Sequence, residues 1–145
     1  MNILVIEDNL LKREKIVSFL VENFAASITE AASYNSGLTA AMSANFDFLV
    51  LDMSMPTFER SDSTQGGRFR SIAGKEIANK LKKLGKLPPF VVLTGYKDFS
   101  VKSENLSLDQ IHDLLTTIGD NYKGCILFNS AETHWQEKLK EIIGQ

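Results

Sequence analysis

Short apolar runs alternate along this chain with longer segments of helical periodicity. Five runs are rich in branched residues: Ile3 to Ile6, Ser27 to Ala31, Phe48 to Leu51, Phe90 to Leu93 and Cys125 to Phe128. All but the second are nearly continuous apolar stretches, which is typical of strands buried on both faces of a parallel sheet. Thr29 and Glu30 interrupt the second run, so we expect that strand at an edge of the sheet.

The longer segments carry the apolar stripes of amphipathic helices. Ile16, Leu20 and Phe24 recur every fourth residue and so share one face of the first helix. We expect its opposite, polar face to carry Lys12, Arg13, Lys15 and Glu22. Further stripes follow at Leu38–Met42, Ile77–Leu84, Ile111–Ile118 and Trp135–Ile143. Ser107, with Gln110 three residues on, predicts a capping box before one of these helices.

This alternation predicts an α/β fold, a doubly wound five-stranded parallel sheet with helices on both faces. Two connections are long and polar, Thr57 to Ala73 and Tyr96 to Asn105. The first has no periodicity and contains Gly66 and Gly67, so we expect an irregular excursion beside a strand end. No repeat or linker interrupts the pattern, and we expect a single domain over residues 1–145.

Composition narrows the classes of function. With 43% apolar and 23% charged residues, a chain of 145 residues can bury one ordinary core. The formal net charge of −2 gives no general attraction to nucleic acid or to anionic lipid, so we expect neither as a partner. The N-terminus lacks the features of a secretion signal and no run reaches membrane-spanning length, so we expect a cytoplasmic protein.

Residues that can bind ligands or take part in reactions follow three of the predicted strands. Glu7 and Asp8 end the first run, Asp52 ends the third, and Thr94 and Gly95 end the fourth. The carboxyl ends of parallel strands form the ligand crevice of an open sheet, and right-handed crossovers bring these three strands together. We therefore expect the three carboxylates to meet in one crevice.

Such a cluster calls for a cation. Two like charges 4 Å apart repel by about 4 kcal/mol at an effective dielectric constant of 20. Oxygen ligands alone suit Mg²⁺, which also keeps positions open for phosphate oxygens. We predict a magnesium site at Glu7, Asp8 and Asp52, in which Asp52 attacks a phosphoryl group and the Thr94 hydroxyl donates to a phosphate oxygen.

Three segments resemble the receiver domain of bacterial response regulators: Ile3–Asn9, Leu49–Pro56 and Val91–Gly95. The match runs the full length of the chain, and the three motifs recur in the right order at three strand ends. The resemblance implies a flavodoxin-like sheet of order 2-1-3-4-5. It also implies phosphotransfer from a histidine kinase to Asp52.

The same resemblance implies which residues serve the site. The magnesium ligands would be Glu7, Asp8, Asp52 and the backbone carbonyl of Ser54. Thr94 matches the hydroxyl residue that shifts towards the phosphoryl group on activation.

The chain also departs from the family. Asn129 stands where the family has a lysine at the end of the fifth strand, and losing that cation costs roughly 1–3 kcal/mol of phosphoryl stabilisation. Ile126 falls at the position of the aromatic switch residue. The usual glycine after the proline is best matched by Gly74, which leaves an insertion. The missing charge has four candidate sources: Arg60, Arg68, Arg70 and Lys97.

Two functions remain open. The first is a stand-alone receiver that takes a phosphoryl group from a histidine kinase or phosphotransfer protein and signals to a downstream effector protein in trans. The second is a pseudo-receiver that binds partners independently of phosphorylation, as Asn129 and Ile126 suggest. We expect no enzyme: an aspartyl phosphatase would need a carboxylate two residues after Asp52, where Ser54 stands.

Overall fold

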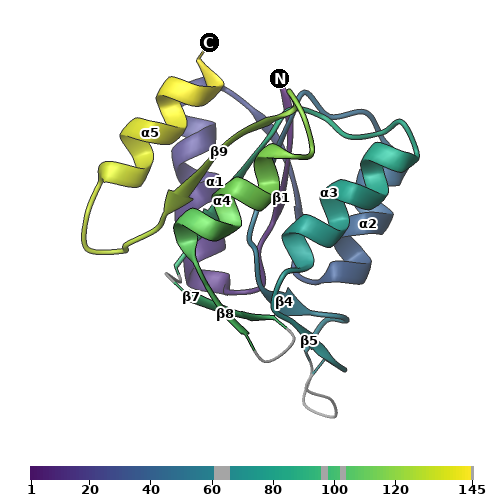
Figure 1. Ribbon diagram of the computed structural model, residues 1–145. Helices are drawn as coiled ribbons and strands as arrows, with labels where there is room; N and C mark the ends of the chain where they lie inside the picture. The colour runs from purple at the N-terminus through teal and green to yellow at the C-terminus, as the bar shows by residue number, and fades with distance from the viewer. Residues whose placement is uncertain (61–65, 96–97, 102–103, 145) are drawn as a thin grey trace.

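Five parallel strands form the central sheet of the computed structural model, which describes residues 1–60, 66–95, 98–101 and 104–144 (Figure 1). The strand order is β2-β1-β3-β6-β9. The bounds are β1 Asn2–Ile6, β2 Ser27–Ala31, β3 Phe48–Leu51, β6 Phe90–Thr94 and β9 Tyr122–Leu127. The predicted flavodoxin-like sheet is confirmed, and the strand that polar residues interrupt does lie at an edge.

Helices cover both faces of this sheet (Figure 1). Their bounds are α1 Leu10–Phe24, α2 Tyr34–Ser43, α3 Ala73–Lys83, α4 Leu108–Thr116 and α5 His134–Ile143. On one face, Ile3 and Val5 of β1 belong to the same core as α1 and α5. On the other, Leu4 and Ile6 pack in a core with α2, α3 and α4. Alternate residues of one strand therefore serve two cores, which explains why the buried strands are apolar throughout.

Side-chain caps fix where the helices begin. The Asn9 side chain accepts a hydrogen bond from the backbone N–H of Lys12 at 3.0 Å and so starts α1 directly after Glu7 and Asp8. Ser107 and Gln110 form the predicted capping box of α4. The first turn of α1 thus lies beside the end of β1.

Two short antiparallel hairpins include parts of the two long polar connections, of which we expected the first to be irregular. Met55–Pro56 (β4) pairs with Phe69–Arg70 (β5), and Asp98–Val101 (β7) pairs with Glu104–Ser107 (β8). Both hairpins project from the lower end of the sheet in Figure 1. Pairing satisfies backbone groups in these long connections, and it needs no apolar pattern that sequence reasoning could detect.

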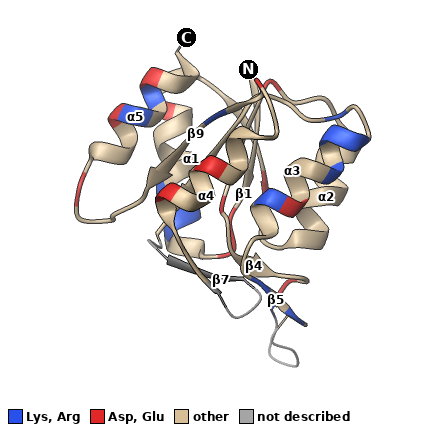
Figure 2. Ribbon diagram, viewed as in Figure 1, with Lys and Arg blue, Asp and Glu red and all other residues tan. Residues whose placement is uncertain are grey.

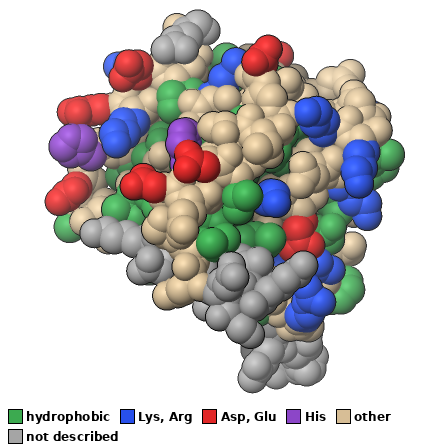
Figure 3. Space-filling model, viewed as in Figure 1, with side chains coloured by type: hydrophobic (Ala, Val, Ile, Leu, Met, Phe, Trp, Pro, Cys, Tyr) green, Lys and Arg blue, Asp and Glu red, His purple; other side chains and the backbone are tan. Residues whose placement is uncertain are grey.

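Charged residues are spread over the helices, and Figure 2 shows both signs interspersed on α5. Lys and Arg side chains gather over α3 on one side of the molecule (Figure 3). Lys80, Lys82 and Lys83 form the last turn of α3, where positive charge complements the helix dipole. In the part of the chain that the structure describes, no helix has the length and apolar character to cross a bilayer.

Candidate functional site

The carboxylates of Glu7, Asp8 and Asp52 converge as the sequence predicted: one oxygen from each lies within 4.8 Å of the others. The convergence follows from the register of the sheet, because Ile6 of β1 lies opposite Leu51 of β3 and the next residues are therefore neighbours. The backbone N–H of Asp52 continues this pairing by donating to the carbonyl of Ile6 at 3.0 Å. Glu7 and Asp52 are only 2% and 4% exposed.

Burial makes this cluster unfavourable when it is fully charged. Burial, with a smaller contribution from the negative charge of Asp52, raises the pKa of Glu7 to about 7. Burial also raises the pKa of Asp8, and the nearby Glu7 adds to that shift. The pKa of Asp52 is raised by burial and is held back by the charge of Lys12. Each carboxylate would therefore gain from a nearby cation.

Lys12 supplies one such cation, and sequence reasoning missed it. Its Nζ lies 2.5 Å from Glu7 Oε1 and 3.4 Å from Asp52 Oδ1. The same ammonium donates to the carbonyl of Leu93 at 2.7 Å and lies 5.6 Å from the centre of the Phe128 ring. We had placed Lys12 on the exposed polar face of the first helix, which is wrong because the residue is 8% exposed.

A signal for this burial was present in the sequence. Lys12 precedes Ile16 by four residues and Leu20 by eight, so it continues the apolar stripe of α1 towards the crevice. A lysine at such a position buries its hydrocarbon stem and carries its charge to whichever polar group lies beyond it. Here those groups are Glu7 and Asp52.

The other predicted site residues also lie at strand ends. Ser54 is 5% exposed, lines the crevice, and donates its hydroxyl to the carbonyl of Ser71 at 2.7 Å. Thr94 ends β6 and is fully buried, and its backbone carbonyl accepts from the N–H of Phe128 at 2.7 Å. Gly95, the next residue, lines the crevice.

These residues belong to a crevice of about 550 Å³ at the carboxyl ends of the strands. Its floor is acidic, and Leu11, Phe69 and Phe128 contribute apolar surface to its walls. Leu11 and Phe69 are 71% and 52% exposed. The crevice therefore combines a charged centre with an apolar rim that solvent and other molecules can reach.

The candidate sources of positive charge from the insertion lie in different places. Arg60 Nη1 lies 3.3 Å from Asp8 Oδ2, and its side chain is 56% exposed. Arg70 stacks on the Tyr34 ring and pairs with Glu76, whereas Arg68 is exposed. Lys97 lies outside the described residues. Among the candidates that the structure describes, Arg60 is the one paired with the acidic cluster.

The segment after β9 forms hydrogen bonds within itself. The Asn129 side chain accepts a hydrogen bond from the backbone N–H of Ala131 at 2.9 Å, and its backbone carbonyl accepts from Glu132. Asn129 therefore stabilises a turn. Ile126 is 2% exposed and belongs to the core beneath α1 and α5.

Gly74 has a clear steric reason to be glycine. A Cβ added there would lie 2.6 Å from the backbone oxygen of Asp52, closer than non-bonded atoms can approach. The Gly74 N–H also donates to the carbonyl of Met53 at 2.9 Å. The glycine thus lets the first turn of α3 support the backbone that carries Asp52.

The donor set fits a magnesium ion. Mg²⁺ takes hard oxygen ligands at about 2.0–2.1 Å in octahedral geometry, so neighbouring ligand oxygens lie about 3–4 Å apart. Glu7, Asp8 and Asp52 offer three carboxylates whose oxygens are spaced at about this distance. They form the one such group among the residues that the structure describes. Lys12 pairs with the carboxylates of Glu7 and Asp52, and Arg60 pairs with that of Asp8.

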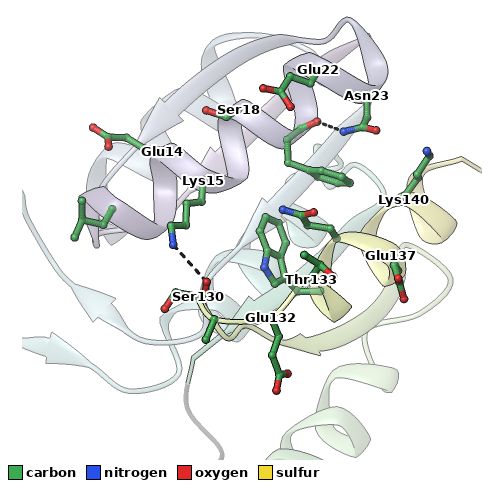
Figure 4. Close-up of a pocket in the computed structure, with 15 residues that line it drawn as sticks. Glu14, Lys15, Ser18, Glu22, Asn23, Ser130, Glu132, Thr133, Glu137 and Lys140 are labelled. Carbon is green, nitrogen blue, oxygen red and sulfur yellow. Dashed lines mark hydrogen bonds between the residues drawn. The ribbon is translucent and has the colours of Figure 1, made fainter.

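A second hollow of about 790 Å³ lies between α1 and α5 (Figure 4). Its labelled side chains include Glu14, Glu22 and Lys140, of mixed charge, and Lys15 reaches the backbone carbonyl of Ser130 at 3.5 Å. Lys15 and Ser130 line both this groove and the crevice. The groove gathers no metal-binding group among the described residues.

Comparison with solved structures shows that this is the receiver fold of response regulators. The response regulator TrrA of Thermotoga maritima, in complex with Mg²⁺ and BeF, matches with a TM-score of 0.65 and 23% identity over 97% of each chain. Chemotaxis protein CheY4 of Vibrio cholerae matches with a TM-score of 0.66 and 18% identity, over 99% of this chain and 95% of that one.

Sequence comparison extends the likeness to full-length proteins. The Detocs response regulatory protein DtcB of Enterobacter cloacae is 28% identical over 147 residues, which cover 99% of this chain and 98% of that protein. The uncharacterized protein y4jR of Sinorhizobium fredii is 23% identical over 144 residues, which cover 97% of this chain and 95% of that protein. No protein-family model matches the chain. The resemblance that the three sequence motifs predicted is confirmed.

Proposed function

We propose that this protein is a response regulator that accepts a phosphoryl group on Asp52. The observation that carries the proposal is the meeting of Glu7, Asp8 and Asp52 at the carboxyl end of a parallel sheet, in a crevice open to other molecules. The likeness to DtcB and to TrrA supports it, because the former is named a response regulatory protein and the latter was solved with Mg²⁺ and BeF.

In this proposal the donor is a phosphohistidine on a histidine kinase or a phosphotransfer protein. An Asp52 carboxylate oxygen bonds to phosphorus as the phosphorus–nitrogen bond breaks, and the imidazole leaves with the bonding electron pair. Glu7, Asp8, Asp52 and the carbonyl of Ser54 would hold Mg²⁺, which supplies positive charge for the phosphoryl oxygens when bound. The Thr94 hydroxyl would donate to one of those oxygens.

The donor protein must reach Asp52 through the mouth of the crevice. Leu11 and Phe69 form an exposed apolar rim there, which suits contact with a protein donor. We further propose a single receiver domain that acts in the cytoplasm and passes its signal to an effector protein in trans.

The test is phosphorylation by a small-molecule phosphodonor, followed by mass spectrometry of the intact protein. We expect one added phosphoryl group in the presence of Mg²⁺, and none after chelation or in Asp52→Asn. An unmodified wild-type protein, or equal labelling of Asp52→Asn, would contradict the proposal.

One alternative has an observation in its favour. Lys12 already neutralises part of the acidic cluster, and Asn129 carries no charge, so the chain could act as a pseudo-receiver that needs neither metal nor phosphate. That function predicts partner binding of equal strength in wild type and Asp52→Asn. A receiver that signals through phosphorylation predicts that only the wild type changes its partner affinity on treatment with phosphodonor.

A further inference from the structure

We propose that Lys12 is the residue that binds the phosphoryl group on Asp52, acting from the first turn of α1 in place of a lysine after β9. This inference rests on the proposed function and names the cation that serves it. It concerns a residue that contacts the reacting carboxylate directly: Lys12 Nζ lies 3.4 Å from Asp52 Oδ1.

The position of the ammonium is well defined by its surroundings. It donates to the carbonyl of Leu93, one residue before Thr94, and lies over the ring of Phe128, one residue before Asn129. The side chain from α1 thus carries a charge into the space between the ends of β6 and β9. A cation placed there faces Asp52 from the side of these two strands.

The other described cations of the crevice are less suited to this role. Lys15 and Arg60 line the crevice but are exposed, and Arg60 pairs with Asp8. Asn129 uses its side chain in a turn. Only Lys12, among these described residues, is both buried and in contact with Asp52.

This arrangement gives Lys12 opposite effects on two ligands. Before phosphorylation, its ammonium pairs with Glu7 and Asp52 and so competes with Mg²⁺ for the same oxygens. A phosphoryl group adds negative charge at Asp52, and the cluster then accommodates both cations. Lys12 should therefore weaken the binding of Mg²⁺ alone and strengthen the binding of a phosphoryl group beside Mg²⁺.

The experiment measures both affinities by calorimetry on the full chain. Mg²⁺ is titrated first, and beryllofluoride, a mimic of aspartyl phosphate, is then titrated at saturating Mg²⁺. In Lys12→Met we expect tighter Mg²⁺ binding, but beryllofluoride binding that is weaker by about 10- to 100-fold, the value of a hydrogen bond to a charged group. The two affinities of Lys12→Arg should lie nearer to those of wild type. Lys80→Met, at the far end of α3, should have the same affinities as wild type.

A structural role for Lys12 would weaken both affinities together, and that outcome would overturn the inference. Unchanged beryllofluoride affinity in Lys12→Met would also overturn it. If wild type itself binds no beryllofluoride, the proposed function fails as well, so the two failures are distinguishable. A second measurement avoids folding effects: in wild type, the side-chain NMR signals of Lys12 should shift on adding beryllofluoride, and unshifted signals would contradict the inference.

Discussion

Glu7 Oε1 and Lys12 Nζ lie 2.5 Å apart, and both side chains are buried. The charge state of each therefore affects the other. A buried ion pair need not stabilise a fold, because desolvation of the two charges offsets their attraction. Here the pair has another consequence. Lys12 and Arg60 compensate part of the negative charge that Glu7, Asp8 and Asp52 bring together.

Stability in chelator should fall as the pH rises from about 4.5 to 8. The pKa of Glu7 rises on folding from 4.5 to about 7, so the folded protein holds a proton that the unfolded chain releases. This stabilisation is complete below the unfolded pKa and is lost as the pH passes the folded pKa. The loss should be of order 2–3 kcal/mol, measured by urea denaturation. The raised pKa values of Asp8 and Asp52 act in the same direction.

Glu7→Gln is the control for this pH dependence, since its amide cannot titrate. Its free energy of unfolding should vary less with pH than that of wild type. If wild type gained stability over this range while Glu7→Gln did not, the raised pKa of Glu7 would be wrong.

At the scale of elements, the end of β3, α1 and the first turn of α3 build the site together. β3 places Asp52, α1 brings Lys12 against it, and Gly74 lets α3 approach the Asp52 backbone. The close approach leaves no room for a side chain at Gly74. The loop after Asp52 is therefore held by packing of backbone against backbone.

Gly74→Ala should lower the free energy of unfolding by about 1–3 kcal/mol, the usual cost of overpacking. The added Cβ would meet the Asp52 oxygen at 2.6 Å, so the backbone of the phosphoryl acceptor must move. Chemical denaturation measures the loss. Gly95→Ala is the matched control for stability, because its Cβ meets nothing within 4 Å. Equal stabilities of the two variants would contradict the steric account.

The rim of the crevice should matter for a protein donor and not for a small one. We expect Leu11→Ser to slow phosphotransfer from a phosphorylated kinase or phosphotransfer protein by about fivefold or more, since one buried apolar contact contributes about 1 kcal/mol to an interface. Labelling by a small phosphodonor should be unchanged. Leu84→Ser, at the end of α3, is the control, with a side chain that is 50% exposed. Equal slowing with both donors would exclude a docking role.

Sequence patterns predicted the elements of the sheet better than the contacts between them. Branched apolar runs identified all five strands, although β9 begins at Tyr122 and we placed its start at Cys125. The pairing of β9 with β6 continues beyond the apolar run to Tyr122, across a register shift between Phe90 and Val92 of β6. Gly124, with φ of +146°, lies on the β9 side of this shift. The pairing of the two hairpins and the partners of the Lys12 ammonium depend on contacts between segments, which local periodicity does not encode.

At the scale of the whole molecule, the residues that line the crevice come from distant parts of the sequence, between Glu7 and Ser130. Residues of α1 and residues that directly follow β1, β3, β6 and β9 line the same crevice. A ligand that binds the folded crevice should therefore stabilise the entire sheet. This follows because unfolding separates every ligand that the metal would use.

Mg²⁺ should raise the thermal midpoint of the wild-type protein. At about one hundred times the dissociation constant, a ligand adds about 2.7 kcal/mol to the stability of the folded state. Potassium chloride of equal ionic strength is the control for screening. The effect should be smaller in Asp52→Asn, which removes one carboxylate from the cluster. An equal rise in both proteins would place the metal elsewhere.

The most direct test of the central claim is the change in amide chemical shifts of wild type on adding Mg²⁺ and beryllofluoride. If Glu7, Asp8 and Asp52 form a phosphoryl-accepting site, the amides around these residues should shift, and shifts should extend through Thr94 into β6 and β9. A spectrum that does not change at Asp52 would contradict the account.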